Sequence, residues 1–289
     1  MTGAFKRRNG ERRSDLHGIG HRLQQELRRL GPEGARIRMR VGDGGLDETG
    51  MLFDGKTDIA LVTPTAALSL LHGFGDLQGL LALGVVPRSG GLVVAADARL
   101  GEDTVAGLVA RADRVTIATA ADDGVNLVGF AVRRALRMAG VAAGVDFVYA
   151  EQPAVCCARY ATGQADVVIH DLMSAPEWPK IAAERPVTYL SWGRRVLHAF
   201  AGQGWPTRVL PAGRLTDLGA GLPTLDCSDI AVLCREDLDD ELAALTARTL
   251  ARASRPAEAS EVTRTPLPLH PGASRAYADL FAAVPLRSR

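Results

Sequence analysis

The chain contains the stretch GKTDIALVT at residues 55–63 and a related stretch, GQADVVIHD, at residues 163–171. Each begins with a glycine, which ends a helix readily because it adopts the left-handed conformation without a Cβ clash. Each then passes through an aspartate into a run of apolar residues, the pattern of a parallel strand buried on both faces. Two copies of this helix-to-strand junction predict two α/β lobes. The alternative is chance recurrence of a common junction.

Polar side chains follow both apolar runs. Thr63 and Thr65 come after the first run, and His170 and Asp171 end the second. Ligands of open α/β sheets bind beyond the carboxyl ends of the strands, so we expect these residues at a cleft between the lobes. Adjacent strand residues point to opposite faces. We therefore expect His170 and Asp171 to act as one cleft residue and one cap, rather than as an acid/base pair or a metal site.

The order of predicted elements indicates two crossings between the lobes. A strand is predicted at 37–41, apolar segments at 80–86 and 91–96 carry the chain out, and 228–234 carries it back. We expect lobe 1 at 1–93 and 200–289 and lobe 2 at 94–199. Each is an α/β unit with a mixed, mainly parallel sheet flanked by helices, and the hinge strands lie near Ala95 and Val232. A single doubly wound sheet is the rival architecture.

The composition is that of an ordinary globular protein. The chain has 289 residues, 47% of them hydrophobic, and a net charge of +1, which provides no field for nucleic acid. We find no cofactor motif, metal-ligand spacing or nucleophile elbow, and so expect no cofactor, no metal and no catalytic residue. The four cysteines lack Cys-x-x-Cys spacing and are expected to be buried thiols; a Cys227–Cys234 disulfide would require export.

Two further stretches supply candidate ligand-binding residues. Gly44 lies in a glycine-rich loop that offers either flexibility or backbone contact to a ligand. Between a predicted strand at 115–119 and a predicted helix at 125–139 lie Asp122, Asp123, Gly124 and Asn126. One aspartate is expected to cap that helix. The alternative is that the aspartates select a ligand with an amino group or several hydroxyls, with Asn126 pointing into the cleft.

Four stretches of the chain resemble the solute receptors of TRAP transporters of the TAXI type, which have the type II periplasmic-binding-protein fold. They are LFDGKTDIALV at 52–62, VTIA at 115–118 with the helix ending at Ala139-Gly140, YATGQAD at 160–166, and LHPGA at 269–273 followed by Tyr277. The HPGA tail is the most specific of these. We expect His270 to hold its turn through a ring N–H.

The resemblance implies a solute-binding protein that captures a small polar molecule, of amino-acid or organic-acid type, and serves membrane permease subunits. Trp192, near the predicted return crossing, is expected either to stack on that ligand or to pack between the lobes. The chain departs from the family in its charged residues 1–13 and in the acidic turn at 121–124, so the usual organic-acid ligand does not carry over directly.

The expected location depends on the start of the chain. The resemblance implies a periplasmic or extracellular protein, whereas no apolar segment follows the basic residues 1–13, as a secretory signal would require. The chain as encoded is thus expected in the cytoplasm, unless its true start lies upstream. Two other functions remain open. One is a cytoplasmic enzyme or sensor subunit that reuses the fold, for example a decarboxylase or precursor-synthesis enzyme, and the other is a paralogue that binds nothing tightly.

Overall fold

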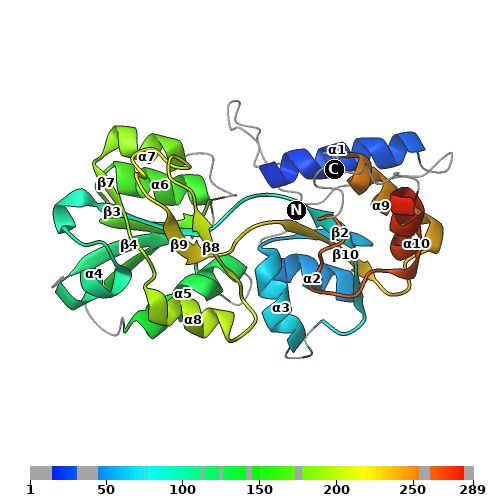
Figure 1. The fold of residues 1–289 in the computed structure, drawn as a ribbon, viewed down its shortest axis with the longest axis horizontal. Helices are drawn as coiled ribbons and strands as arrows, with labels where there is room; N and C mark the ends of the chain where they lie inside the picture. The colour runs from blue at the N-terminus through cyan, green and yellow to red at the C-terminus, as the bar shows by residue number, and fades with distance from the viewer. Residues whose placement is uncertain are drawn as a thin grey trace, which may run out of the picture.

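The structure is a computed structural model that describes residues 15–30, 45–73, 75, 77–111, 114–123, 126–140, 145–150, 152–172, 178–253 and 261–282. The described chain forms two α/β lobes that lie side by side and are joined by two extended segments (Figure 1). Each lobe has its own sheet with helices around it. The two-lobe prediction is therefore confirmed, and the single doubly wound sheet is excluded.

The first lobe is built on a three-stranded sheet. In it, β10 (Ile230–Arg235) lies between β1 (Ile59–Val62) and β2 (Leu80–Val86) and runs antiparallel to both. Its helices are α1 (Asp15–Leu30), α2 (Gly45–Phe53), α3 (Thr65–Gly73), α9 (Asp240–Ala253) and α10 (Pro271–Ala282). The apolar stripe of α1 packs on α9, because Ile19, Leu23 and Leu27 recur at helical spacing and are buried. The predicted strand at 37–41 and Gly44 lie outside the described residues.

The second lobe is built on a larger sheet of five strands in the order β5–β4–β6–β3–β7. The strands are β3 (Leu92–Asp97), β4 (Val115–Thr119), β5 (Val145–Tyr149), β6 (Val167–Asp171) and β7 (Val187–Tyr189). The helices are α4 (Val105–Arg111), α5 (Leu127–Ala139), α6 (Pro153–Ala161), α7 (Trp178–Glu184) and α8 (Arg194–Ala201). β4 is parallel to β5 and β6, and β3 is antiparallel to β6 and β7.

The two copies of the repeated stretch form different kinds of strand. β6 is buried along its whole length and runs parallel to β4, as predicted. For β1 the prediction of a parallel, doubly buried strand is wrong, because half-buried and buried residues alternate and its described partner β10 is antiparallel. The glycines behave alike: Gly55 has φ 65° and Gly163 has φ 74°, so both helices end in the left-handed conformation.

Two segments connect the lobes: 87–91 leads from β2 to β3, and 226–229 leads from β9 to β10. Hydrogen bonds hold them together, since the Asp229 N–H donates to the Arg88 carbonyl over 3.1 Å and the Arg88 N–H donates to Asp229 Oδ1 over 2.8 Å. The Gly90 N–H donates to Ser228 Oγ over 3.1 Å. Ala95 and Val232, near which we expected the hinge, lie within the two sheets instead.

Residues 207–225 contact the second lobe, although we expected the first lobe to resume at residue 200. A ribbon of two strands, β8 (Thr207–Leu210) and β9 (Leu222–Leu225), lies with α8 against the five-stranded sheet (Figure 1). The Thr224 hydroxyl donates to the Leu92 carbonyl over 2.6 Å, which fixes β9 to the start of β3. We had placed residues 200–225 in the first lobe; we now propose that the lobes are divided at 87–91 and at 226–229.

The HPGA tail is explained by packing within the first lobe. His270 precedes α10, and its ring Nδ1 accepts from the Gly272 N–H over 3.2 Å, so the expected ring N–H donor is in fact an acceptor. A Cβ on Gly272 would lie 2.3 Å from the Asp240 carbonyl oxygen, which makes glycine necessary where α10 meets α9. The Tyr277 hydroxyl donates to the Leu83 carbonyl over 2.9 Å.

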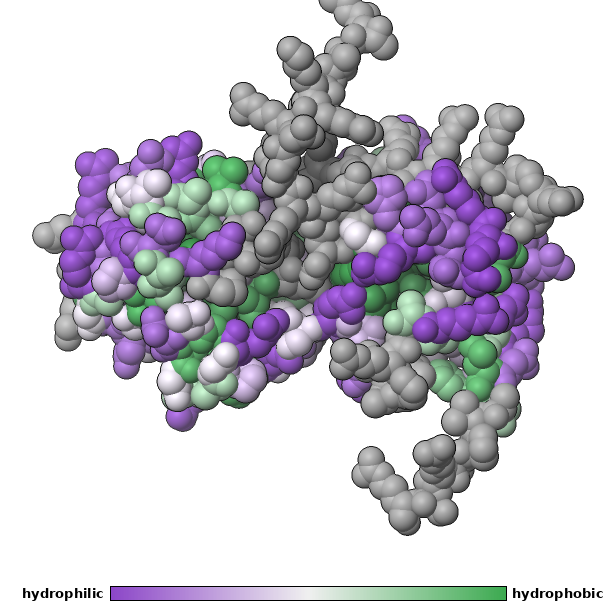
Figure 2. Space-filling view, turned by 90° about the horizontal axis from the view of Figure 1, so that it is seen from above, coloured by the Kyte–Doolittle hydropathy of each residue, from purple (hydrophilic) through white to green (hydrophobic). Residues whose placement is uncertain are grey.

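The largest apolar cluster runs through both lobes, from the sheet of the first lobe to α5 and the inner strands of the second. Seen from above, hydrophilic residues cover much of the lobe that carries α1 (Figure 2).

Among the described helices, none is long and apolar enough to cross a membrane. All four cysteines are buried and free, so the expectation of buried thiols is confirmed and a Cys227–Cys234 disulfide is excluded.

Candidate functional site

Two parallel strands of the second lobe end at the same edge of the sheet. Thr119 is the last residue of β4, and its backbone partner in β6 is Ile169, two residues before Asp171. Thr119 and Asp171 therefore lie on the same face of the sheet, because side chains alternate along a strand. Thr119 has no exposed surface and Asp171 is 2% exposed. Asp171 also pairs with Leu92 at the start of β3, which places it beside the outgoing crossing.

His170 and Asp171 are in direct contact, contrary to our expectation. The ring Nδ1 of His170 lies 3.1 Å from Asp171 Oδ2 and 2.9 Å from the Asp171 backbone N. Without a proton, Nδ1 accepts from that N–H; with a proton, it donates to the carboxylate, and it cannot do both. Where Nδ1 accepts, the proton of a neutral ring is on Nε2, which is buried and has no hydrogen-bond partner among the described residues. Alternation along the strand did not predict this contact, because Nδ1 of the His170 ring lies close to both the backbone N–H and the carboxylate of the next residue.

The return crossing passes close to this pair. Burial raises the pKa of the Cys227 thiol well above its ordinary value, and the nearby carboxylates of Asp171 and Asp226 raise it further. The three tryptophans of the chain fix the same region, because each donates its indole N–H to a carbonyl there. The carbonyls belong to Asp171 for Trp178, to Leu92 for Trp192 and to Asp226 for Trp205, over 3.1, 2.9 and 2.8 Å.

The turn before α5 is capped by a residue other than the one we expected. Asn126 is the N-cap, and its side-chain oxygen accepts from the N–H groups of Val128 and Gly129 over 2.9 and 3.0 Å. The expectation that an aspartate caps this helix is therefore wrong. Asp123 Oδ1 instead accepts from the Asn126 N–H over 3.0 Å, and Asp122 and Asp123 are exposed. Gly124 lies outside the described residues.

A glycine that the sequence reasoning missed supports this turn. A Cβ on Gly129 would lie 1.8 Å from the Ala121 carbonyl oxygen. The first turn of α5 can therefore approach the end of β4 only because residue 129 has no side chain. With the N–H groups of 128 and 129 already bonded to Asn126, the cap occupies donors that an anion would otherwise use.

The first lobe contributes hydroxyls. Thr63 Oγ1 donates to the Asp229 carbonyl over 3.5 Å, which ties the end of β1 to the return crossing. Thr65 begins α3, and its Oγ1 is buried with no hydrogen-bond partner among the described residues. The same holds for Thr119 Oγ1 in the second lobe. Unpaired buried hydroxyls are uncommon in folded proteins and mark places where a water or ligand completes the bonding.

Trp192 is a packing residue in this structure. Its side chain is 1% exposed and belongs to the large apolar cluster. Its indole N–H is bonded to the Leu92 carbonyl. Because the side chain is buried, neither face of the ring is open for stacking.

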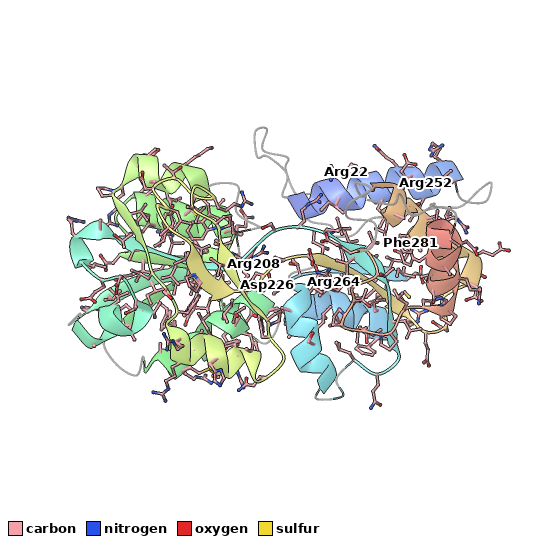
Figure 3. All side chains as sticks on the ribbon, viewed as in Figure 1. Arg22, Arg208, Asp226, Arg252, Arg264 and Phe281 are labelled. Carbon is pink, nitrogen blue, oxygen red and sulfur yellow. The ribbon has the colours of Figure 1, made fainter. Side chains whose placement is uncertain are left out.

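An arginine that we did not anticipate holds the two crossings. Arg208 of β8 donates through Nη1 to the Gly90 carbonyl over 3.1 Å and also bonds the Ser228 hydroxyl. Asp226 Oδ1 lies 3.4 Å from the same nitrogen. Arg208 and Asp226 lie at the junction of the lobes (Figure 3). No local sequence pattern predicts this arrangement, because Arg208 bonds residues that are distant from it in the chain.

Within the described part of the chain, no three His, Cys, Asp or Glu side chains gather as metal ligands would. Of the ten predicted site residues, His170 and Asp171 end β6, Thr63 directly follows β1, and Thr65 begins α3. Asn126 caps α5, Trp192 packs inside, Asp122 and Asp123 are exposed, and Gly44 and Gly124 are not described.

Comparisons with known proteins support this architecture. No family model and no curated protein matches the sequence. A solved "periplasmic transporter" aligns with a TM-score of 0.54 and 9% identity, over 93% of this chain and 89% of that one. The protein XAC2383 of Xanthomonas citri, solved with chloride, aligns with a TM-score of 0.51 and 16% identity, over 93% and 91% of the two chains. The chain therefore has the two-lobe, type II periplasmic-binding-protein fold.

Proposed function

We propose that this chain is a solute-binding protein that captures a small polar molecule between its two lobes. The observation that carries the proposal is the buried pair of His170 and Asp171 at the carboxyl end of β6, next to the crossings. In α/β sheets this edge is where ligands bind. The hydroxyls of Thr65 and Thr119 supply further hydrogen-bonding groups at strand and helix ends of the two lobes.

The carboxylate of Asp171 and the ring of His170 indicate what kind of polar molecule would bind. Asp171 is a carboxylate at 2% exposure, where low local dielectric strengthens its attraction for a cation. When Nδ1 of His170 accepts from the Asp171 N–H, the buried Nε2 carries a proton and offers an N–H donor to an oxygen of the ligand. A solute with an ammonium group and a neighbouring oxygen, such as an amino acid, fits this combination. The exposed Asp122 and Asp123 add negative potential at the same end of the lobe.

The transport role is the finer part of the proposal. The resemblance of residues 52–62 and 269–273 to the TAXI-type receptors supports a role as the receptor of a TRAP-type transporter. Its partners would then be membrane permease subunits, and its site of action the periplasm or cell exterior. Co-purification with a permease encoded beside the gene tests this role separately from ligand binding.

Ligand binding is tested by thermal unfolding of the full chain with amino acids, amines, sugars and organic acids. A ligand present at 100 times its Kd stabilises the folded state by about 2.7 kcal/mol. We expect ammonium-bearing solutes to raise the melting temperature of the wild type and of Asp58→Asn, an exposed control in the first lobe. Asp171→Asn should lose the response. If no class of solute changes the wild-type melting temperature, the proposal fails.

A second candidate is an enzyme, favoured by one observation. The His170–Asp171 contact of 3.1 Å has the geometry by which a carboxylate orients a general base. In that case the same residues would move a proton rather than hold a ligand. Incubation of the wild type and His170→Gln with ammonium-bearing solutes, followed by mass spectrometry, separates the two. Turnover that His170→Gln abolishes indicates an enzyme, and unchanged solutes indicate binding alone.

A further inference from the structure

The two segments that connect the lobes are fastened to the second lobe at Arg208. Its Nη1 donates to the Gly90 carbonyl of the outgoing segment over 3.1 Å and also bonds the Ser228 hydroxyl of the return segment. The Asp226 carboxylate lies 3.4 Å from the same nitrogen and balances its charge. Because Arg208 belongs to β8, whose ribbon packs on the second lobe, one side chain ties both segments to that lobe.

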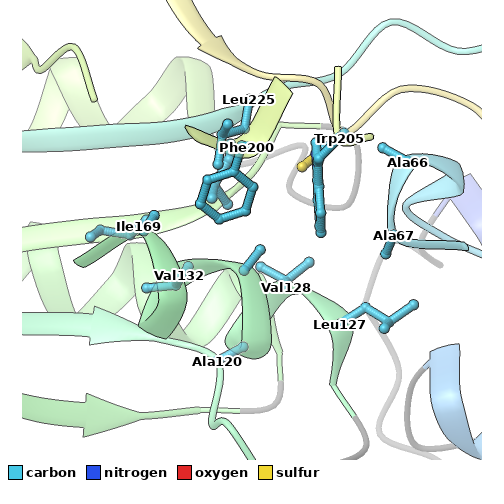
Figure 4. Packing of buried hydrophobic residues seen from close by; sticks show 14 of the residues in the cluster. Ala66, Ala67, Ala120, Leu127, Val128, Val132, Ile169, Phe200, Trp205 and Leu225 are labelled. Carbon is cyan, nitrogen blue, oxygen red and sulfur yellow. The ribbon is translucent and has the colours of Figure 1, made fainter. Parts of the chain in front are cut away.

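Trp205 adds a second attachment on the return segment. Its indole N–H donates to the Asp226 carbonyl over 2.8 Å, and the Asp226 N–H donates to the Pro206 carbonyl over 2.9 Å. The edge of the ring meets Phe200, with 5.6 Å between ring centroids. Figure 4 shows Trp205 between Phe200 of the second lobe and Ala66 of α3 in the first lobe. The ring is therefore bonded to the second lobe, and the boundary between the lobes lies between Trp205 and α3.

The outgoing segment has a matching attachment. The Leu172 N–H, directly after β6, donates to the Gly91 carbonyl over 2.9 Å. The Ser228 hydroxyl joins the two segments, because it donates to the Gly90 carbonyl and accepts from the Gly90 N–H, each over 3.1 Å. Both segments are thus attached to the second lobe as far as Gly90 and Ser228.

A different set of bonds fastens the same segments to the first lobe. Arg88 and Asp229 exchange two bonds, of 3.1 and 2.8 Å, and Thr63 Oγ1 donates to the Asp229 carbonyl over 3.5 Å. These bonds continue the pairing of β2 with β10, in which Val86 lies opposite Ile230. The first lobe therefore extends along the segments to Arg88 and Asp229.

A short link separates the two sets of bonds on each segment. On the outgoing segment the link is Ser89, which is exposed and whose carbonyl accepts a long bond of 3.5 Å from Arg214. On the return segment it is the peptide between Ser228 and Asp229. Asp229 has φ 64°, a conformation that residues other than glycine rarely adopt. Rotation between two packed lobes is absorbed at a few such loop or element-terminal residues.

We propose that Arg208 is a clamp that holds both segments on the second lobe, so that the lobes bend at Ser89 and at the 228–229 peptide. Without the clamp, bending would spread into residues 90–91 and 226–228, and the angle between the lobes would be less well defined. Because the clamp consists of bonds within the chain, it acts whether or not a solute is bound between the lobes.

The distribution of distances between the lobes tests the clamp, measured by pulsed electron paramagnetic resonance on the full chain. Spin labels are attached at Ala158→Cys in α6 and Ala278→Cys in α10, which are exposed, whereas the four native thiols are buried. Arg208→Met keeps an apolar stem but no donor, so we expect a broader distribution than in the wild type. Arg208→Lys keeps a charged donor, should broaden the distribution less, and serves if the methionine variant does not fold.

Arg214→Ala is the matched control, because it removes an exposed arginine of the same ribbon that reaches the outgoing segment over 3.5 Å. It should leave the distribution unchanged. An unchanged distribution in folded Arg208→Met and Arg208→Lys would overturn the clamp. Equal broadening in Arg214→Ala would overturn it as well, since the loss of any charge from the ribbon would then suffice.

Amide hydrogen exchange locates the bending. In Arg208→Met, the N–H groups of Gly90 and Ser228 should exchange about five- to ten-fold faster, the effect of losing about one hydrogen bond. Those of Arg88 and Asp229 should keep their wild-type rates, because their bonds belong to the first lobe. Equal acceleration at all four N–H groups would show that the segments loosen as one unit, and the assigned bending points would be wrong.

Discussion

The two copies of the glycine–aspartate junction, at residues 55–63 and 163–171, are similar in sequence but differ in structure. In the second lobe, Asp166 Oδ2 accepts from the Thr116 N–H over 3.0 Å, and the strand that follows is buried on both faces. In the first lobe, Asp58 is exposed and the strand is half-buried. The second lobe ends its copy with His170 and Asp171, and the first with two threonines. Under the proposed function, charge recognition would belong to the second lobe, and the first would contribute hydroxyls.

The largest difference between the lobes should come from two helical glycines. Gly129→Ala in the second lobe should destabilise the protein by about 3 kcal/mol, because the new Cβ overlaps the Ala121 carbonyl. Gly50→Ala in α2 of the first lobe meets nothing within 4 Å and should be neutral or stabilising by up to about 1 kcal/mol. Chemical denaturation measures both. Equal changes in the free energy of unfolding would show that α5 can shift away from the Ala121 turn without loss of stability.

The second prediction separates the paired aspartates. Asp166→Ala leaves the half-buried Thr116 N–H without its acceptor and should cost about 1–2 kcal/mol. Asp58→Ala removes an exposed side chain and should change the free energy of unfolding by less than about 0.5 kcal/mol. Urea denaturation of the two variants measures both changes in the free energy of unfolding. A loss at Asp58 as large as that at Asp166 would mean that the copies are equivalent after all.

The third prediction concerns acid stability. The guanidinium of Arg99, with that of Arg185, holds the pKa of Asp97 well below its usual range. Because the folded-state pKa is depressed, this stabilisation is complete above about pH 4, the unfolded value, and is lost as pH falls toward the folded value. Asp97→Asn should therefore lower stability at pH 7 and flatten the decline between pH 5 and pH 3. The exposed first-lobe pair of Asp240 and Arg275 should contribute less.

If the stability of Asp97→Asn falls between pH 5 and pH 3 as steeply as that of the wild type, this assignment is wrong. Asp240→Asn is the matched control, since the pKa of Asp240 is also lowered by a neighbouring arginine but its side chain is 51% exposed.

The smallest effect concerns the thiols, which report whether the lobes open together. Burial raises the pKa of Cys156 in the second lobe to about 11 and that of Cys234 in the first lobe to about 12. At pH 8 the native protein should therefore react with a thiol reagent only through opening. Cys156 lies in an apolar cluster of the second lobe and Cys234 in one of the first. Because a larger cluster runs through both lobes, we expect the two thiols to react at a common rate. Separate rates, followed by peptide mass spectrometry, would show that the lobes open independently.

The fold could be predicted from local patterns, but the pairing of its strands could not. Glycine after a helix and an apolar run after aspartate placed β1 and β6 correctly. The sequence does not indicate that β10 inserts antiparallel between β1 and β2, because that pairing joins residues distant in the chain, such as Ile59 and Cys234. The short β9, with a proline inside it, lacked a strand signal altogether.

The candidate site was only partly readable for similar reasons. Strand ends predicted Thr65 and Asp171, since the carboxyl edge of a sheet is a general location for ligands. Asn126 competed with two aspartates for the cap of α5, and only the backbone conformation decides among them. Trp205 and Arg208 act through partners distant in sequence, Ala66 and Gly90 among them, so no local pattern reveals their roles.

The central claim is that Asp171 holds a positively charged solute between the lobes. Calorimetric titration of the best-binding ammonium solute into the wild type and into Asp171→Asn tests it most directly. We expect one site per chain in the wild type and a loss of about 100-fold in affinity in the variant, the effect of removing one member of a buried charge pair. An unchanged Kd in a variant that is still folded would contradict the claim.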